Sequence, residues 1–197
     1  MSEQDVKRYI EAGKETRHLE YKQSVSWKDT NAKRKITKSI LGMSNIKDGG
    51  TILIGMQQQR DKSYFPQGVN RDDLSSFENE DEIKDFVSAY ADPYVEFDIK
   101  IEPYNGKKFV LINVSEFDEL PVICKKECSG ILRRGALYVR SRRKPETVEV
   151  PTEVEMREII NLAIDKGNLK LSKRGYEMSN READEQFYMH QLKDLES

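Results

Sequence analysis

The stretch NIKDGGTILIG, residues 45–55, decides the fold, because a helical pattern ends in it and a buried strand begins in it. The apolar residues before it recur at helical spacing and predict a helix from about residue 31 to residue 46, with Asn31 as its N-cap. Asp48, Gly49 and Gly50 then break the helix and turn the chain, because glycine accepts backbone conformations that other residues avoid. The continuous apolar run TILIGM, residues 51–56, predicts a strand that is buried on both faces.

The segments around this stretch alternate between helical and strand periodicity. We expect helices at residues 3–13, at 80–90 and from Pro151 to about Gly167, strands at 16–25, 120–125 and 135–141, and a hairpin at 94–117 that turns at Asn105-Gly106. Residues 57–73 are polar and rich in turn formers, which predicts a loop. This order predicts an α+β fold in which a mixed sheet is flanked by helices.

The last part of the chain differs from the rest in composition. Residues 168–197 are polar and end in a stretch with Phe187, Leu192 and Leu195 that can form a helix. We therefore expect one domain over residues 1–167 and a polar C-terminal tail over residues 168–197. The tail would be disordered alone or would dock on a partner subunit as a dimerisation helix.

The overall composition bounds the class of protein. Charged residues make up 35% of the 197 residues and apolar residues 37%, which is typical of a globular protein with a heavily charged surface. No apolar run approaches the roughly 20 residues of a membrane helix, and the N-terminus lacks the apolar core of a signal peptide. Two cysteines, Cys124 and Cys128, do not form a disulfide framework. These features predict a cytoplasmic protein with no membrane partner.

The net charge of −2 conceals a strong segregation of charge along the chain. Two runs are basic and nearly free of acids, and they contain Lys22, Lys33, Arg34 and Lys38 in the first and Arg133, Arg134, Arg140, Arg142, Arg143 and Lys144 in the second. Either run alone is typical of a solvated surface. Two such runs in one small domain predict that they form the two walls of a groove. This groove would hold the phosphate backbone of DNA or RNA without a cofactor. Tyr21, Trp27 and Tyr138 are aromatic residues that could stack on bases, although such residues more often belong to the core or its rim.

A third pattern, ETRHLEYK at residues 15–22, places two carboxylates near a lysine. Residues two apart on a strand share a face, so Glu20 and Lys22 lie side by side, and Glu15 joins them only from the turn before the strand. Such a group can hold a metal ion against a phosphodiester. It is equally typical of an ordinary ion pair at the start of a strand.

The order of these motifs resembles the Schlafen AlbA-like domain, a family described as DNA-binding. The match covers residues from about 5 to 165 and is carried by E-x4-E-Y-K, SNIKDGGTILIGM, PVIC, GALYVRSRRKP and PTEVEMREII. In the Schlafen branch that cleaves tRNA and rRNA, three carboxylates form the site, and two of them match Glu15 and Glu20. The third would fall at Gln58, and the nearest acid that could replace it is Asp61. Schlafen cores pair two such lobes, which implies a homodimer for a chain with one.

Three functions follow as hypotheses. The first is a nucleic-acid-binding protein, including a regulatory one, that uses the two basic runs. The second is a metal-dependent nuclease that uses Glu15, Glu20 and Lys22 with Mg²⁺ or Mn²⁺, although Gln58 supplies no negative charge to such an ion. The third is a protein-interaction adaptor that works through the acidic run at residues 72–85.

Overall fold

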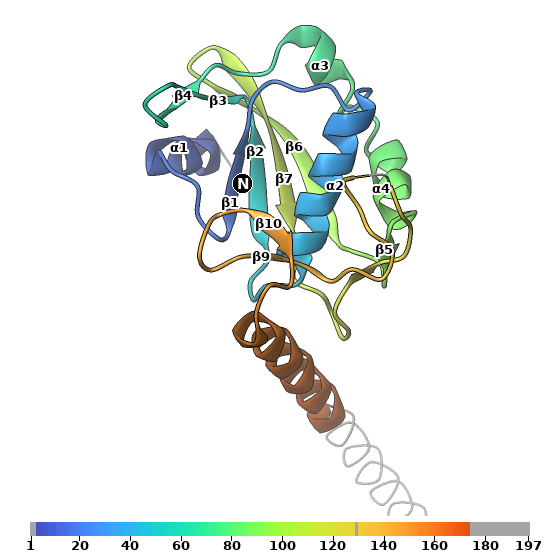
Figure 1. Ribbon diagram of the computed structural model, residues 1–197. Coiled ribbons are helices and arrows are strands. Elements are labelled where there is room, and N and C mark those ends of the chain that lie inside the picture. The colour runs from blue at the N-terminus through green and yellow to red at the C-terminus, as the bar shows by residue number, and fades with distance from the viewer. Residues whose placement is uncertain (1–2, 129, 174–197) are drawn as a thin grey trace, which may run out of the picture.

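A four-stranded mixed sheet forms the centre of the computed structural model, which describes residues 3–128 and 130–173 (Figure 1). The strands follow the order β1-β2-β7-β6, with bounds Leu19–Lys22, Gly50–Ile54, Lys107–Val114 and Phe97–Tyr104. The β1 strand runs parallel to β2, and the other pairs are antiparallel. This architecture confirms the predicted α+β class with its mixed sheet.

Each face of the sheet carries its own core, because successive residues of a strand point to opposite sides. Ile52 and Ile54 of β2 face the larger core, which includes Ile36 and Ile40 of α2 (Thr30–Ser44). Leu53 faces a second core together with residues of α1 (Glu3–Ala12). The helices α1 and α2 thus cover opposite faces in Figure 1. The prediction that residues 51–56 form a strand buried on both faces is correct for β2.

The ends of α2 explain how the helix leads into the sheet. The N-cap is Asp29 rather than the predicted Asn31, because the Asp29 carboxylate accepts hydrogen bonds of 2.8 Å from the backbone N–H groups of Asn31 and Ala32. At the other end, Asp48 and Gly49 both have positive φ angles, 65° and 63°. The chain thereby reverses into β2, as the sequence predicts.

Smaller elements complete the domain. They are β3 (Met56–Gln58), β4 (Tyr64–Pro66), α3 (Arg71–Ser75), α4 (Glu80–Ser88), β5 (Ala91–Asp92), β8 (Ile123–Cys124), β9 (Tyr138–Arg140) and β10 (Thr147–Glu149). β3 and β4 form an antiparallel hairpin within the segment that the sequence predicts to be a loop. β9 and β10 form a second ribbon, which crosses α2 (Figure 1).

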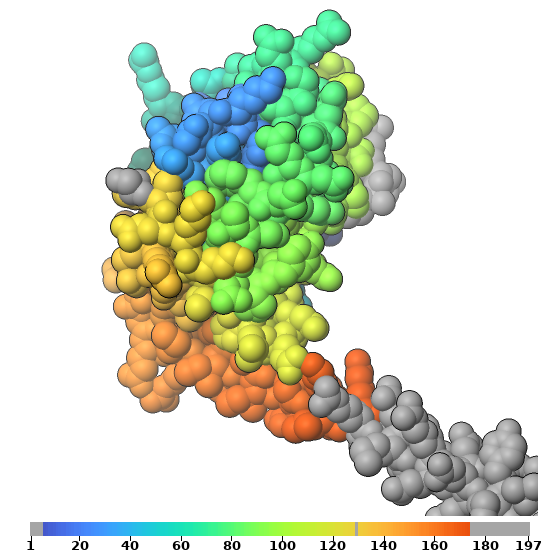
Figure 2. Space-filling model, turned by 90° about the vertical axis from the view of Figure 1, so that its right-hand side faces the viewer, coloured from blue at the N-terminus to red at the C-terminus, as the bar shows by residue number. Residues whose placement is uncertain are grey.

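A C-terminal helix, residues 153–173, leaves the body of the molecule (Figures 1 and 2). It begins after Pro151 as predicted, but it continues through Gly167, where the sequence predicts its end. The remainder of the predicted tail, residues 174–197, lies outside the described residues. Across residues 3–128 and 130–173, no helix is long and apolar enough to cross a membrane.

Candidate functional site

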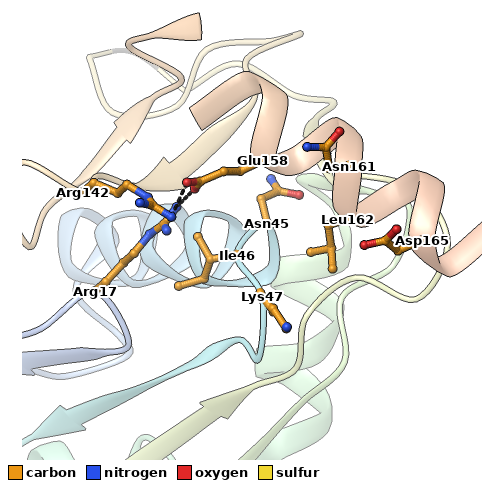
Figure 3. A pocket seen from close by; sticks show the side chains of 9 residues that line it. All are labelled: Arg17, Asn45, Ile46, Lys47, Arg142, Glu158, Asn161, Leu162 and Asp165. Atoms are coloured by element: carbon orange, nitrogen blue, oxygen red, sulfur yellow. Dashed lines mark hydrogen bonds and ion pairs between the residues drawn. The ribbon is translucent and has the colours of Figure 1, made fainter. Parts of the chain in front are cut away.

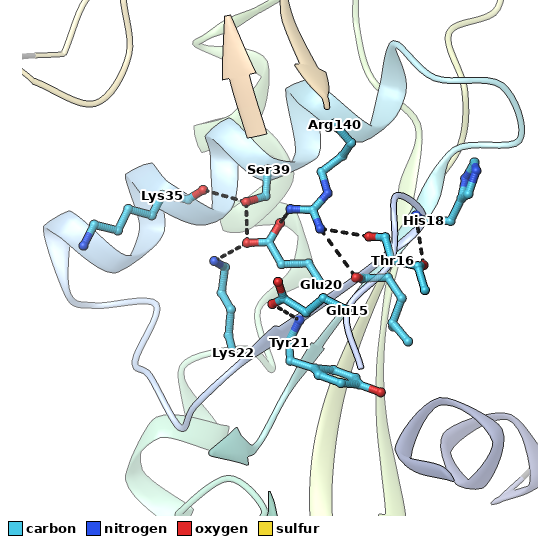
Figure 4. A network of polar contacts seen from close by, with 10 residues as sticks. Glu15, Thr16, His18, Glu20, Tyr21, Lys22, Lys35, Ser39 and Arg140 are labelled. Carbon is cyan, nitrogen blue, oxygen red and sulfur yellow. Dashed lines mark hydrogen bonds and ion pairs between the residues drawn. The ribbon is translucent and has the colours of Figure 1, made fainter. Parts of the chain in front are cut away.

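A buried ion pair between Glu20 of β1 and Arg140 of β9 lies at the centre of the candidate site (Figure 4). Glu20 is 8% exposed and Arg140 is 1% exposed. The Arg140 guanidinium donates from Nη1 to Glu20 Oε2 at 2.9 Å and from Nη2 to the backbone oxygen of Thr16 at 3.0 Å. The pair therefore joins two segments that are far apart in the sequence.

Two further groups donate to the same carboxylate. Lys22 Nζ and Ser39 Oγ of α2 donate to Glu20 Oε1 at 2.5 and 2.9 Å. Lys22 and Glu20 lie on one face of β1, as their spacing predicts. Both carboxylate oxygens of Glu20 are thus occupied by donors from β1, α2 and β9.

Glu15 lies beside Glu20 in the segment before β1, the position that the sequence predicts for it (Figure 4). Its Oε1 accepts a hydrogen bond of 3.0 Å from the backbone N–H of Tyr21. Burial raises the pKa of the Glu15 carboxyl above its ordinary value of 4.5, the Tyr21 hydrogen bond lowers it, and the charge of Glu20 raises it further. The net effect is a raised pKa, so the folded protein retains a proton on Glu15 more readily than the unfolded chain.

Because its pKa is raised, the charged form of Glu15 destabilises the folded protein, and the size of this effect depends on pH. A carboxyl whose folded pKa is raised stabilises the fold while it is protonated, and that stabilisation is lost as the pH rises from 4.5 through the folded pKa. Glu15→Gln should therefore unfold at a higher temperature than the wild type at about pH 7, with a smaller difference at about pH 4. Thermal unfolding followed by circular dichroism across this range measures both differences.

The matched control is Glu153→Gln, which removes one charge from an exposed carboxylate on the C-terminal helix. It corrects for the change in net charge. A difference between Glu15→Gln and the wild type that stays constant with pH, or that favours the wild type at neutral pH, would contradict the prediction.

Gln58 occupies the position at which the resemblance predicts a third carboxylate, and its side-chain amide lies next to a pair of tyrosines. Gln58 Nε2 donates to the Tyr64 hydroxyl at 3.3 Å. The Tyr64 ring packs edge-on against Tyr21, with ring centroids 4.7 Å apart. Burial and the neighbouring charge of Glu15 raise the pKa of Tyr64, and burial raises the pKa of Tyr21 to about 12. The Tyr64 hydroxyl therefore remains neutral beside Glu15, and the Tyr21 hydroxyl remains neutral where it donates to the backbone oxygen of Tyr9.

Asp61 does not take the place of a third carboxylate. It lies in the turn between β3 and β4, where its Oδ1 accepts hydrogen bonds from Ser63 N at 3.0 Å and Ser63 Oγ at 2.6 Å. Over the two described ranges, no group of three His, Cys, Asp or Glu side chains is arranged to hold a metal ion. The oxygens of Glu20 already accept from Lys22, Ser39 and Arg140, so the residues present do not fit a divalent ion.

Three arginines of the second basic run are paired with carboxylates of their own chain. Arg140 pairs with Glu20, and its burial removes it from any surface that a phosphate can reach, which corrects the expectation that it contacts nucleic acid. Arg133 and Arg142 are exposed but pair with Glu149 and Glu158. The remaining three cations of this run, Arg134, Arg143 and Lys144, are exposed, and no carboxylate forms an ion pair with them within the described part of the chain.

The first basic run meets the second only in part. Lys38 of α2 lies over the ring of Tyr138 on β9, with its Nζ 5.1 Å from the ring centroid. Arg133 lowers the pKa of Glu149, and Lys38 lowers it further, so Glu149 lies between the two runs.

Two other cations of the first run lie elsewhere. Lys33 lies over Phe86 of α4, and Arg34 is half-buried. The structure therefore brings Lys22 and Lys38 to the β9 side and places Lys33 elsewhere.

Two residues that the sequence analysis missed hold this region together. Arg17 donates from Nε to the backbone oxygen of Arg140 at 3.0 Å and from Nη2 to Glu158 Oε2 at 2.7 Å. With Arg142 and Glu158 it lines a pocket of about 250 Å³ (Figure 3).

The buried Asn45 amide donates to the backbone oxygens of Val122 and Tyr138 at 2.8 and 2.9 Å. Arg17 is part of the ETRHLEYK motif, and Asn45 begins the stretch that decides the fold.

The acidic run has a structural explanation in the two short helices. Asp72 and Asp73 lie in the first turn of α3, and Glu80, Asp81 and Glu82 lie in the first turn of α4. Negative charge at a helix N-terminus is stabilising. Asp73 also accepts a hydrogen bond of 2.7 Å from Ser24 Oγ. These positions give five of the seven acids of the run a role in stabilising the two helices.

Comparison with known proteins identifies a family and several distantly similar solved structures, two of which are described here. The model of the family described as Schlafen, AlbA_2 matches residues 15–149. The DIP2311 protein from Corynebacterium diphtheriae is 14% identical with a TM-score of 0.47, and the match covers 73% of this chain but only 24% of that one. The N-terminal domain of a DNA helicase RecG-related protein from Nitrosomonas europaea is 17% identical with a TM-score of 0.45, over 78% of this chain and 98% of that one. No curated protein matches the chain.

Proposed function

The chain belongs to the Schlafen AlbA_2 family, and from this premise we propose that it binds nucleic acid by holding the phosphate backbone. The observation that supports this proposal most directly is a set of exposed cations beside the β9–β10 ribbon without carboxylate partners in the described part of the chain: Arg134, Arg143 and Lys144. We call these three residues, together with Lys38, Arg133 and Arg142, the basic surface.

The members of the basic surface differ in how readily they would contact a phosphate. At Arg133 and Arg142, a phosphate must first displace Glu149 or Glu158. At Arg143 and Lys144 it displaces only counterions, and their release favours binding. We therefore infer that these two residues contribute more to the affinity than the paired arginines do.

The burial of the aromatic residues supports recognition of the backbone rather than the bases. Tyr21, Trp27 and Tyr138 are all buried and are not available to stack on bases. Without these three rings as a stacking platform, cationic contacts to phosphates are the main source of affinity that remains. We expect little preference for sequence, and DNA and RNA are both candidates as ligands.

Salt dependence tests this proposal. The double variant Arg143→Gln/Lys144→Gln should reduce the slope of log K against log salt by about 1.8 on duplex DNA, because each lost phosphate contact contributes about 0.9. The affinity at about 0.1 M salt should fall roughly tenfold or more. Fluorescence anisotropy with labelled DNA and RNA duplexes over a range of salt concentrations measures the slope and the affinity.

The control variant Lys108→Gln/Lys173→Gln removes two exposed lysines outside the basic surface. It should leave the slope nearly unchanged. An equal loss for both variants would show that only net charge matters, and a wild type that binds neither duplex at low salt would refute the proposal. The same reactions with Mg²⁺ and Mn²⁺, resolved on denaturing gels, test for cleavage and thus for the nuclease hypothesis.

A further inference from the structure

Glu158 of the C-terminal helix is held between two arginines that come from distant parts of the chain (Figure 3). Its Oε2 accepts a hydrogen bond of 2.7 Å from Arg17 Nη2, and its Oε1 pairs with Arg142 Nη2. Arg17 precedes β1, and Arg142 follows β9. The loop before β1, the loop after β9 and the C-terminal helix therefore meet at one carboxylate.

This carboxylate does not saturate the two arginines. Each arginine meets one of its oxygens, and neither Nη1 group has an acceptor within the described part of the chain. A guanidinium can pair with a carboxylate or a phosphate through two parallel hydrogen bonds, because its donors form a planar fork. Arg17 and Arg142 thus keep donors available for a further anion.

The pocket beside the arginines gives such an anion access to them. It measures about 250 Å³ and includes the buried Ile46 and the half-buried Leu162 in its lining. Charges beside an apolar wall act more strongly than charges that are surrounded by water. The pocket therefore suits a small anionic group better than the open surface does.

The charges of the pocket are divided between its two ends. In Figure 3, Arg17 and Arg142 point towards Glu158 at one end, whereas the other charged residues of the lining, Lys47 and Asp165, lie towards the other end. The arginine end carries two positive charges against one negative charge. If the Glu158 side chain turned away, both positive charges would be free for an external anion.

A phosphodiester group matches the chemistry of the carboxylate that lies between the arginines. Both groups present two free oxygens that share one negative charge, so each oxygen can meet one arginine. Every nucleotide of a nucleic-acid strand carries such a group. Arg142 also belongs to the basic surface and is followed by Arg143 and Lys144, so the pocket is continuous with that surface.

We propose that Arg17 and Arg142 form a phosphate site and that Glu158 is its built-in competitor, which a backbone phosphate displaces when nucleic acid binds. The inference rests on the proposed function and adds Arg17 to the residues that contact the ligand. Partly exposed ion pairs contribute little to stability, so displacement is inexpensive. The burial of Ile159 keeps the helix in place when the neighbouring Glu158 side chain turns away. Glu158 thus lowers the affinity for nucleic acid.

Removal of the competitor is expected to strengthen binding. Glu158→Gln should raise the affinity for a duplex about five- to tenfold at about 0.1 M salt, because one more phosphate is neutralised, and should steepen the slope of log K against log salt by about 0.9. Fluorescence anisotropy with labelled DNA and RNA duplexes measures both quantities. Glu153→Gln is the matched control, since it removes one charge from an exposed carboxylate of the same helix, and it should leave both nearly unchanged.

Two double variants locate the gain at the arginines. Adding either Arg17→Gln or Arg142→Gln to Glu158→Gln should cancel the gain. Arg17 also holds the backbone oxygen of Arg140, so thermal unfolding checks that its variant is folded. The Arg142 variant decides if it is not, because the Arg142 side chain is 59% exposed. A gain that survives the loss of Arg142, or an equal gain for Glu158→Gln and Glu153→Gln, would overturn the proposal.

Inorganic phosphate separates a failure of this inference from a failure of the proposed function. If duplexes bind but the two glutamate variants gain equally, the phosphate site is refuted and the proposed function stands. If the wild type binds no duplex, thermal unfolding in about 20 mM phosphate is compared with chloride at the same ionic strength. A larger rise in melting temperature for Glu158→Gln than for Glu153→Gln would support the site without the proposed function, and an equal rise would overturn both.

Discussion

Replacing Arg140 with alanine is expected to lower the free energy of unfolding by about 3–5 kcal/mol, because removal of one partner leaves a buried charge without compensation. The orphaned group would be Glu20, 8% exposed, which would keep only Lys22 and Ser39 as donors. The backbone oxygen of Thr16 would also lose the Arg140 donor and keep only the longer hydrogen bond of 3.4 Å from the backbone N–H of Leu19. Urea unfolding followed by tryptophan fluorescence measures the change, since Trp27 is buried in the larger core.

Arg134→Ala is the matched control, because Arg134 is exposed in the same basic run, and substitutions of this kind change stability by about 0.5 kcal/mol or less. Arg140→Lys should recover only part of the loss, since an ammonium cannot reproduce the fork that reaches both Glu20 and Thr16. A loss below about 1 kcal/mol for Arg140→Ala would contradict a structural role for the pair. If the prediction holds, weaker binding of nucleic acid by an Arg140 variant reports on folding and not on contact with phosphate.

The case of Arg140 shows what the sequence can predict about the site. Composition places six cations in residues 133–144, but the partners of the three paired arginines, Glu20, Glu149 and Glu158, lie outside that run. Pairing is a property of the folded chain, and no local pattern carries it. By contrast, the position of Lys22 beside Glu20 follows from strand geometry alone, and the structure shows it.

The same distinction holds for the fold. The helix α2, the strand β2 and the turn at Asn105-Gly106 are local patterns, and all three were predicted. The sequence does not predict that the C-terminal helix continues through Gly167. Glycine in a helix lowers its stability by about 1 kcal/mol relative to alanine and normally indicates the end of a helix. Ion pairs of Lys166 and Lys170 with the body, on either side of Gly167, offset that cost.

Gly49→Ala is expected to destabilise the protein by roughly 2–5 kcal/mol. Alanine disfavours the left-handed backbone conformation of this position, and its Cβ atom would overfill the site. Gly49 has a φ of 63°, and a Cβ added there would lie 2.0 Å from the backbone oxygen of Val114. That oxygen belongs to β7, the central neighbour of β2, so it cannot move without disturbing the sheet. Urea unfolding measures the loss, and a soluble but molten product would show as loss of near-ultraviolet circular dichroism.

Gly106→Ala is the control that separates the conformational cost from the cost of the close contact with Val114. Gly106 also has a positive φ, 72°, but a Cβ there would meet no heavy atom within 4 Å. This variant should therefore show only the conformational cost, about 1–2 kcal/mol. Equal losses for the two variants would mean that the contact with Val114 adds nothing. A larger loss at Gly49 would establish that close approach of the DGG turn to β7, and not backbone freedom alone, requires glycine at this point of the sequence.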